Sequence, residues 1–139
     1  MEAHSVPPAA LERIRQDAYI RFLGATWEAI EPGYARVSLT VTESLLNFHG
    51  ITHGSIVFSV GDLAFSAACN AHGRAAVALD MTISFLCATH AGDHLMAEAR
   101  EVSLNNKTGL YDITVTETNA NQIVAKIQAT AYRKREMLE

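Results

Sequence analysis

The sequence has few charged side chains and no excess of positive ones. Charged residues make up 19% of its 139 residues, and 11 Lys and Arg stand against 15 Asp and Glu, for a net charge of −4. A chain without a basic excess lacks the field that holds a phosphate backbone, so we expect no nucleic-acid binding. A lone chain of this length exposes much of its surface. Because so few charges are available to cover that surface, we expect a homo-oligomer.

Cysteine is scarce, and long apolar runs are absent. Cys69 and Cys87 match neither a disulfide framework nor a zinc-binding spacing. The longest apolar stretches are broken by Asp62 and Asp80, too early for a transmembrane helix. The N-terminal residues show neither the basic segment nor the apolar segment of a signal peptide. We therefore expect a cytoplasmic protein that does not enter a membrane.

The apolar pattern predicts one α+β domain over residues 1–139. Helical spacing predicts a helix over 9–23, within an N-terminal segment 1–23, and a longer helix over 55–70. Residues 134–139 are expected to form a solvated tail. Alternating apolar residues and turn residues predict strands over 25–30, 34–41, 75–87, 95–104, 110–118 and 123–132. A long helix on a large antiparallel sheet is an α+β layer arrangement.

The helix over 55–70 is apolar on nearly every side, so we expect it to be buried. Its polar residues follow steps of four, three, four and four, which place them on one narrow line along the helix. We call this line the polar stripe; it consists of Ser55, Ser59, Asp62, Ser66 and Asn70. A buried helix therefore presents a single line of polar groups with one carboxylate at its centre.

Asp62 allows two interpretations. Burial of an unpaired carboxylate costs on the order of several kcal/mol, so such a group is paired, protonated or used. In the structural interpretation, Asp62 accepts hydrogen bonds from Ser59 or Ser66 and fixes the packing of the helix. In the functional interpretation, it is a general base or nucleophile whose pKa is tuned by burial. The helix pattern alone favours neither.

The loop over 47–54 leads into this helix and contains two histidines. Unpaired N–H groups and a positive dipole end lie at a helix start, and Gly54 there leaves room for a carbonyl, or simply permits a tight turn. His49 and His53 are four residues apart, but Gly50 argues against a helix between them and the glutamate of HExxH is missing. We therefore predict no metal site and expect His53 to orient the loop or polarise a carbonyl.

Several segments of the sequence together match the motifs of a known family. They are Leu45–Gly54 (LLNFHGITHG), Phe58–Asp62 (FSVGD), Ala67–Asn70 (AACN) with Gly73, Ile83–Leu86, Ala91–Asp93 and Thr108–Ile113. Together they resemble the phenylacetate-degradation (PaaI-type) thioesterases of the hotdog-fold superfamily, over roughly residues 19–133. The resemblance implies a long central helix wrapped by a curved antiparallel sheet. It also implies an acyl-coenzyme A thioesterase without a cofactor, since coenzyme A is part of the substrate.

The resemblance implies roles for five residues. Asp62 corresponds to the catalytic carboxylate, as nucleophile or general base, and Gly54 to the glycine whose N–H binds the thioester oxygen. Asn47 corresponds to an asparagine that places the attacking water or the carboxylate. His53 corresponds to the histidine of a His-Gly-Gly run, and Ser66 to a Ser or Thr of related thioesterases.

The sequence departs from the family pattern at two places, and neither of them involves the Asp62 carboxylate. Ser55 replaces the second glycine of His-Gly-Gly, and Cys87-Ala88 replaces a usual Arg-Pro, which leaves the coenzyme contact there open. Lys107 and Arg74 are candidates to bind the phosphates of coenzyme A, although each alone is more often an ordinary solvated side chain.

The spacing of Gly54 and Asp62 predicts a dimer. Eight residues along one helix correspond to roughly 12 Å. A single thioester carbonyl therefore does not reach both groups within one chain. If both act on one substrate, they come from two subunits whose helices run antiparallel across a two-fold axis. We predict a homodimer with active sites at its interface, and the resemblance implies pairing into a homotetramer.

The predicted activity is hydrolysis of aryl (phenylacetyl or hydroxyphenylacetyl) or medium-chain acyl-coenzyme A in phenylacetate or aromatic catabolism. We expect the acyl pocket to be lined by Phe48, Phe58, Phe65 and Trp27. A non-catalytic domain that binds or senses acyl-coenzyme A is one alternative, and a hotdog dehydratase, which needs an Asp–His pair, is another. A soluble oligomer whose polar stripe is only structural is the third.

Overall fold

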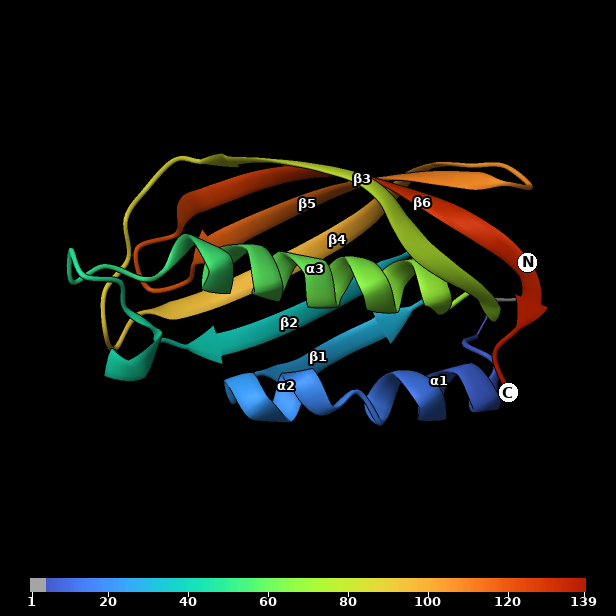
Figure 1. Ribbon diagram of the computed structural model, residues 1–139, viewed down its shortest axis with the longest axis horizontal. Coiled ribbons are helices and arrows are strands. Elements are labelled where there is room, and N and C mark those ends of the chain that lie inside the picture. The colour runs from blue at the N-terminus through green and yellow to red at the C-terminus, as the bar shows by residue number, and fades with distance from the viewer. Residues whose placement is uncertain (1–4) are drawn as a thin grey trace.

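The computed structural model describes residues 5–139 as a helix lying in the concave face of a curved antiparallel sheet, with a shorter helical segment beside it (Figure 1). The first four residues lie outside the described part. The elements are α1 (Pro8–Arg15), α2 (Ala18–Leu23), β1 (Thr26–Glu31), β2 (Tyr34–Thr40), the 3-10 turn η1 (Glu43–Leu45), α3 (Gly54–Asn70), β3 (Arg74–Phe85), β4 (His94–Leu104), β5 (Thr108–Glu117) and β6 (Gln122–Met137). The predicted α+β class is confirmed.

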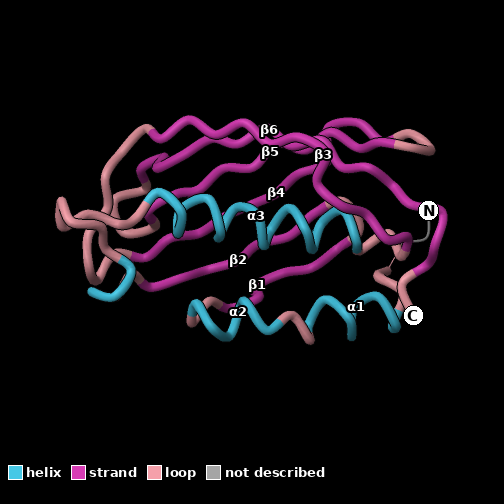
Figure 2. The backbone as a smooth tube through the Cα atoms, in the orientation of Figure 1, coloured by secondary structure: helices cyan, strands magenta, loops and turns pink. Residues whose placement is uncertain are grey.

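The sheet has the strand order β1-β2-β4-β5-β6-β3, and every neighbouring pair is antiparallel. Although β3 follows α3 in sequence, it joins the sheet at the far edge, beside β6. The chain therefore crosses from β2 over the concave face, as α3, before it returns as an edge strand. Figure 2 shows α3 running along this face with strands on both sides of it.

Small side chains on the strands let α3 lie close to the sheet. The strand residues that face the helix are almost completely buried, and nearly half of them are alanine: Ala35, Val37 and Leu39 of β2, Leu95, Ala97 and Ala99 of β4, Tyr111, Ile113 and Val115 of β5, and Ala125, Ile127, Ala129 and Ala131 of β6. Gly61 of α3 follows the same principle, because a Cβ atom at this position would overlap the Cδ1 atom of Ile127. The space left by Gly61 is thus filled by the core and not by a ligand.

The N-terminal segment differs from the single helix that was predicted over 9–23. Two helices, α1 and α2, are separated at Asp17, whose ψ of 115° is not helical. The Asp17 carboxylate accepts a hydrogen bond from the N–H of Tyr19 at 2.9 Å and so caps α2. Gly24, in the left-handed conformation with φ of 74°, ends α2 as expected.

The predicted tail over 134–139 is also wrong for most of its length. Strand β6 continues to Met137, which pairs with Arg74 at the start of β3. The side chains of this last part are largely exposed, so the charged residues do not oppose strand formation. Backbone hydrogen bonds to β3 hold these residues in a strand, although their charged composition does not indicate one.

Helix α3 is buried against the sheet but open on one side. Its core-facing residues are buried, whereas Ser59, Asp62, Ser66 and Asn70 are half-buried and Ser55 is exposed. The prediction of burial on nearly every side is therefore wrong for this single chain, and the polar stripe marks the open side. Within residues 5–139, no helix combines the length and apolar character needed to cross a membrane.

Candidate active site

The Asp62 carboxylate lies at the middle of the polar stripe without a hydrogen-bond donor among residues 5–139. The hydroxyl of Ser59, one turn earlier, donates instead to the carbonyl oxygen of Ser55 at 2.7 Å and lies 3.0 Å from the hydroxyl of Tyr19. No hydrogen bond joins the hydroxyl of Ser66 to Asp62 in this part of the chain either. The structural interpretation, in which these serines hold the carboxylate, is therefore not what the structure shows.

The surroundings of Asp62 make it a stronger base than an ordinary aspartate. Partial burial raises the pKa of its carboxyl above the usual value, and the negative charge of Asp17 adds to the rise. A carboxylate with a raised pKa and no donor is the state expected of a general base or nucleophile rather than of a structural ion pair.

Helix α3 begins at Gly54, and His53 caps it. The Nδ1 atom of His53 accepts a hydrogen bond from the N–H of Ser55 at 3.2 Å and lies 2.8 Å from its hydroxyl. His53 thus orients the loop, as one of its two predicted roles requires. The N–H of Gly54 has no hydrogen-bond acceptor among residues 5–139. An unpaired N–H at the positive end of a 17-residue helix is a ready donor for an oxyanion.

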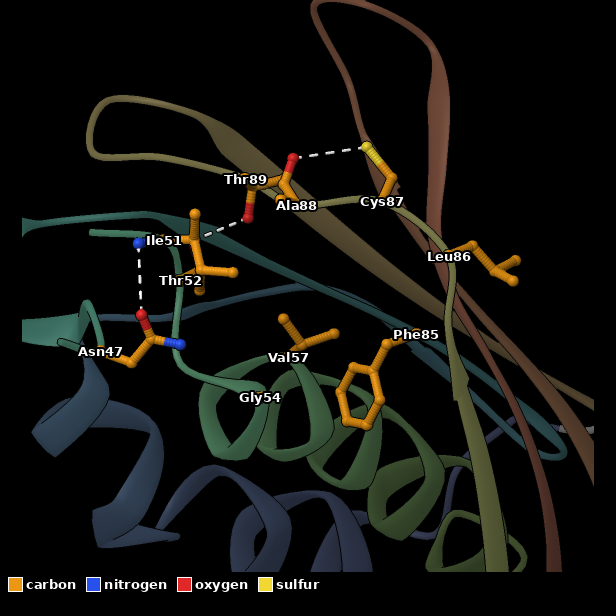
Figure 3. Close-up of a pocket in the computed structure, with 10 residues that line it drawn as sticks. All are labelled: Asn47, Ile51, Thr52, Gly54, Val57, Phe85, Leu86, Cys87, Ala88 and Thr89. Atoms are coloured by element: carbon orange, nitrogen blue, oxygen red, sulfur yellow. Dashed lines mark hydrogen bonds between the residues drawn. The ribbon is translucent and has the colours of Figure 1, made fainter. Parts of the chain in front are cut away.

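Gly54 lines a pocket of about 440 Å³ (Figure 3). The pocket lies between the loop before α3, the first turn of α3 and the segment after β3. Its lining residues are Asn47, Ile51, Thr52, Gly54, Val57, Phe85, Leu86, Cys87, Ala88 and Thr89. The hydroxyl of Thr89 donates to that of Thr52 at 2.7 Å, and the N–H of Thr52 donates to the carbonyl of Thr89 at 2.8 Å, so the two walls are fastened together.

Asn47 and Phe85 occupy opposite walls of this pocket (Figure 3). The Oδ1 atom of Asn47 accepts from the N–H groups of His49 and Ile51, at 2.9 and 3.4 Å, which fixes the loop. Its amide nitrogen remains available, and Figure 3 shows it turned toward the side of Gly54. The ring of Phe85 lies over Gly54, 3.4 Å from where a Cβ atom would stand.

The predicted site residues do not all come together in one chain. Asn47 and Gly54 share the pocket, and His53 adjoins it, but Asp62 is not among its lining residues. Ser66 lies on the polar stripe beyond Asp62 and lines a different, smaller cavity of about 150 Å³. This separation agrees with the helix spacing, which places Gly54 and Asp62 too far apart to act on one carbonyl within a chain.

The two candidates for coenzyme phosphates have different environments. The guanidinium of Arg74 donates to the carbonyl oxygens of Lys134 and Asn106, both at 2.9 Å, and to the Asn106 side chain at 3.1 Å. Arg74 thus ties the start of β3 to β6 and to the β4–β5 turn, and its role as a phosphate ligand stays a prediction. Lys107 is exposed in the same turn.

The four aromatic residues predicted for the acyl pocket are not grouped around it. Phe65 belongs to the core, where its ring packs edge-on against Tyr111 with centroids 5.4 Å apart. Phe48 is 94% exposed at the tip of the loop before α3. Phe58 and Trp27 are half-buried, and Trp27 lines the smaller cavity with Ser66. Across residues 5–139, no three His, Cys, Asp or Glu side chains gather as metal ligands would.

Sequence reasoning missed Phe85, the Thr52–Thr89 pair and Asp17. The two threonines are 37 residues apart, and only the fold brings them together. Asp17 carried one usable signal, because an Asp followed by a short apolar segment is typical of a helix N-cap.

Comparison with known proteins identifies the family of this chain. The family described as the thioesterase superfamily matches residues 49–123, which include Gly54, Asp62 and Phe85. The acyl-coenzyme A thioesterase PaaI of Escherichia coli is 39% identical over 117 residues, which cover 84% of this chain and 83% of that protein. A putative esterase of Archaeoglobus fulgidus is 38% identical over 122 residues, or 88% of this chain and 79% of that protein.

The solved structure of the E. coli PaaI protein, from the phenylacetic acid degradation operon, superposes with a TM-score of 0.89 at 34% identity. It covers 97% of this chain and 100% of its own. The fold of the present chain is therefore the hotdog fold, and the predicted resemblance is confirmed. With its family match over half of the chain and its relatives near 40% identity, the chain belongs to the thioesterase superfamily and is a thioester hydrolase.

Proposed function

We propose that this protein hydrolyses acyl-coenzyme A thioesters to a free acid and coenzyme A. The favoured acyl groups are phenylacetyl, hydroxyphenylacetyl or medium-chain groups, in phenylacetate or aromatic catabolism. The relative from E. coli carries the name of an acyl-coenzyme A thioesterase, and its structure is described as coming from the phenylacetic acid degradation operon. That likeness supports the substrate class.

One observation carries the proposal. Within residues 5–139, the N–H of Gly54 at the start of a helix has no acceptor, and the carboxylate of Asp62 two turns later, on the open side of that helix, has no donor. The N–H of Gly54 polarises the thioester carbonyl and stabilises the oxyanion that develops on it. In one route, the Asp62 carboxylate of a facing subunit attacks the carbonyl carbon, coenzyme A leaves as the thiol, and water then hydrolyses the mixed anhydride to the free acid. In the other route, that carboxylate removes a proton from the attacking water, and the proton leaves with coenzyme A as the thiol.

A dimer is part of the proposal, because Gly54 and Asp62 do not line one pocket. Two features support a second copy of the chain. The polar stripe lies on the side of α3 that the sheet leaves open. Strand β3 is an edge of the sheet, and it exposes Leu79 by 64% and Val77 by 46%. An apolar edge strand of this kind is a template for pairing with another chain. Further pairing into a homotetramer belongs to the same proposal.

The roles proposed for the remaining residues follow from their contacts. Asn47 lines the pocket, and within residues 5–139 its amide nitrogen makes no hydrogen bond, which supports a role in holding the attacking water or the carboxylate. His53 fixes the first turn of α3 and thereby the direction of the Gly54 N–H. Ser66 remains a proposed active-site residue, and Lys107 remains a proposed ligand of the coenzyme A phosphates. No cofactor takes part in the reaction.

A dehydratase fits the site less well than a hydrolase. Such an enzyme needs a histidine beside the carboxylate, whereas the His53 side chain is engaged with Ser55 at the helix start. A domain that only binds acyl-coenzyme A does not need a carboxylate with a raised pKa, so the raised pKa of Asp62 favours a hydrolase over such a domain. Both remain outcomes of the experiment that tests the proposal.

That experiment measures thiol release from phenylacetyl-, hydroxyphenylacetyl-, benzoyl- and straight-chain acyl-coenzyme A by the wild type and by Asp62→Asn. We expect the variant to lose about 10²- to 10⁴-fold in kcat, the range of general acid–base catalysis. Asp112→Asn is the matched control, because Asp112 is an exposed strand residue paired with Lys126 at 3.0 Å, and it should keep full activity.

Each other outcome has a definite meaning. Thioester binding without thiol release by the wild type indicates a sensing domain. Reversible loss of water from a 3-hydroxyacyl thioester, without thiol release, indicates a dehydratase. Equal rates for the wild type and a correctly assembled Asp62→Asn contradict the role of the carboxylate.

A further inference from the structure

The junction between α1 and α2 lies beside the polar stripe of α3. The hydroxyl of Tyr19, on α2, lies 3.0 Å from that of Ser59. Asp17, at the junction, lines the cavity of about 150 Å³ together with Ser66 and Asn70. Ser59 is three residues before Asp62 and Ser66 is four residues after it, so these contacts bracket the carboxylate. Figures 1 and 2 show α1 and α2 running along the open side of the molecule in the direction opposite to α3.

Asp17 is fixed in place, and its charge is not neutralised by an ion pair. Its carboxylate caps α2 through the N–H of Tyr19 at 2.9 Å, which holds the side chain in one position. Within residues 5–139 no salt bridge includes Asp17. Arg13 lines the same cavity, but its guanidinium donates to the backbone oxygen of Glu139 at 2.8 Å.

Three other titratable groups lie near the polar stripe. Cys69, two turns along α3, is neutral because burial raises the pKa of its thiol to about 12. Tyr19 from α2 presents a hydroxyl engaged with Ser59. Arg13 from α1 keeps its positive charge while it donates to the end of the chain, but the causes that raise the pKa of Asp62 are burial and then the charge of Asp17. Two carboxylates in one neighbourhood resist ionising together.

We propose that Asp17 is a positioning residue of this hydrolase, whose fixed carboxylate lines the same cavity as Ser66 and acts electrostatically on Asp62 across the α1–α3 boundary. The inference rests on the proposed function, since it assigns Asp17 a part in the action of Asp62. A base whose pKa lies closer to the working pH accepts a proton from water more readily in the transition state. The N-terminal helices thus act on the reaction without contacting the substrate.

The test compares the wild type with Asp17→Asn and Asp17→Ser. Both variants remove the charge and keep an N-cap residue, so α2 stays capped. The pH dependence of kcat/KM reports the ionisation of the free enzyme, and its acid limb should move to lower pH in both variants. Glu12→Gln, an equal loss of charge at an exposed position of α1, should leave the acid limb in place.

A direct titration of the Asp62 carboxyl carbon by nuclear magnetic resonance separates the two proposals. Its midpoint should fall in Asp17→Asn whether or not the protein turns over a thioester. An unchanged midpoint overturns the inference even if hydrolysis is normal. Absence of hydrolysis by the wild type overturns the proposed function, and the same titration still decides whether Asp17 acts on Asp62.

The salt dependence of the Asp62 midpoint gives a second readout. It would not depend on Asp17 if this residue served only as the N-cap of α2. Raising the ionic strength screens interactions between partly exposed charges. The midpoint of Asp62 should therefore fall with added salt in the wild type and change less in Asp17→Asn. Equal salt dependence in the two proteins contradicts the inference.

Discussion

Two carboxylates of this protein behave in opposite ways. Asp62 lies on the open side of α3 without a donor, and burial raises its pKa. Glu117 lies at the end of β5, where its two oxygens accept from the N–H groups of His94 at 2.7 Å and Ala120 at 2.8 Å. We call this second region the Glu117 corner. The backbone donors there lower the pKa of Glu117 below its usual value.

The comparison distinguishes polar groups whose hydrogen bonds hold the fold together from polar groups that remain available to bind a substrate. At the Glu117 corner both carboxylate oxygens accept hydrogen bonds from backbone N–H groups, and the carboxylate thereby joins β4 to the turn after β5. Along α3, the N–H of Gly54 and the carboxylate of Asp62 have no partner within residues 5–139. Unpaired polar groups of this kind are costly, so their retention indicates chemistry rather than packing.

The sharpest way to break this comparison removes the unpaired N–H alone. Gly54→Pro deletes that donor at the first position of a helix, where proline is tolerated. The preceding residue, His53, has φ of −59° and ψ of 135°, which suits a residue before proline. We expect kcat to fall by about 10²- to 10³-fold, the effect of losing one oxyanion donor.

Gly54→Ala controls for the added side chain in that experiment. Its Cβ atom meets the Phe85 ring at 3.4 Å and leaves the N–H in place. Activity should therefore stay much closer to that of the wild type. Equal losses in the two variants, with intact circular dichroism, would show that space at Gly54 matters and its donor does not.

The opposite result is expected at the Glu117 corner. Glu117→Gln removes the charge that holds the N–H groups of His94 and Ala120, so the free energy of unfolding should fall. The rate constant per folded active site should stay unchanged, because the corner does not adjoin Gly54 or Asp62. Urea unfolding and active-site titration measure the two quantities separately. A loss of kcat without a loss of stability would contradict the comparison.

The smallest expected effect concerns how stability depends on pH. The raised pKa of Asp62 means that folding favours its protonated form. Its contribution is fully present below the unfolded pKa, near 3.8, and is lost as the pH rises through the folded pKa. Asp62→Asn should therefore be slightly more stable than the wild type at neutral pH, and equally stable below about pH 3.8.

Glu117 has the opposite sign, which provides an internal check. Its lowered pKa contributes stability above the unfolded pKa, near 4.5, and this is lost as the pH falls through the folded pKa. Glu117→Gln should thus be less stable at neutral pH, and the difference should shrink in acid. Unfolding midpoints measured at one protein concentration test both signs. The same sign for both variants would refute the contrast.

Most of the fold could be predicted because its local patterns agree with its architecture. The alternation in β2, with Ala35, Val37 and Leu39 inward, and the apolar length of α3 each indicated one structure. The errors lie where tertiary pairing overrides composition. Residues 134–137 carry charges yet pair with β3, and Asp17 interrupts a continuous helical stripe by capping a second helix.

The site was predicted where residues are close in sequence and missed where they are not. Asn47, His53 and Gly54 lie on one loop and meet as expected. The place of Phe85 depends on where β3 ends, and that of Asp17 on how the α1–α2 junction packs beside α3. The sequence could not reveal that Arg74 supports backbone carbonyls, because such an arginine looks, in sequence, like one that awaits a phosphate. Phe65 was wrongly predicted to line the acyl pocket, since core and pocket aromatics share one pattern.

The exposed apolar edge of β3 has a consequence for the newly made chain. Leu79 and Val77 of β3 are uncovered, and any strand-forming segment nearby can extend the sheet there. In the proposed dimer, aggregation and correct association therefore compete for one surface. Substitutions that weaken that association should appear in cells as insoluble protein and poor yield, rather than as an inactive monomer.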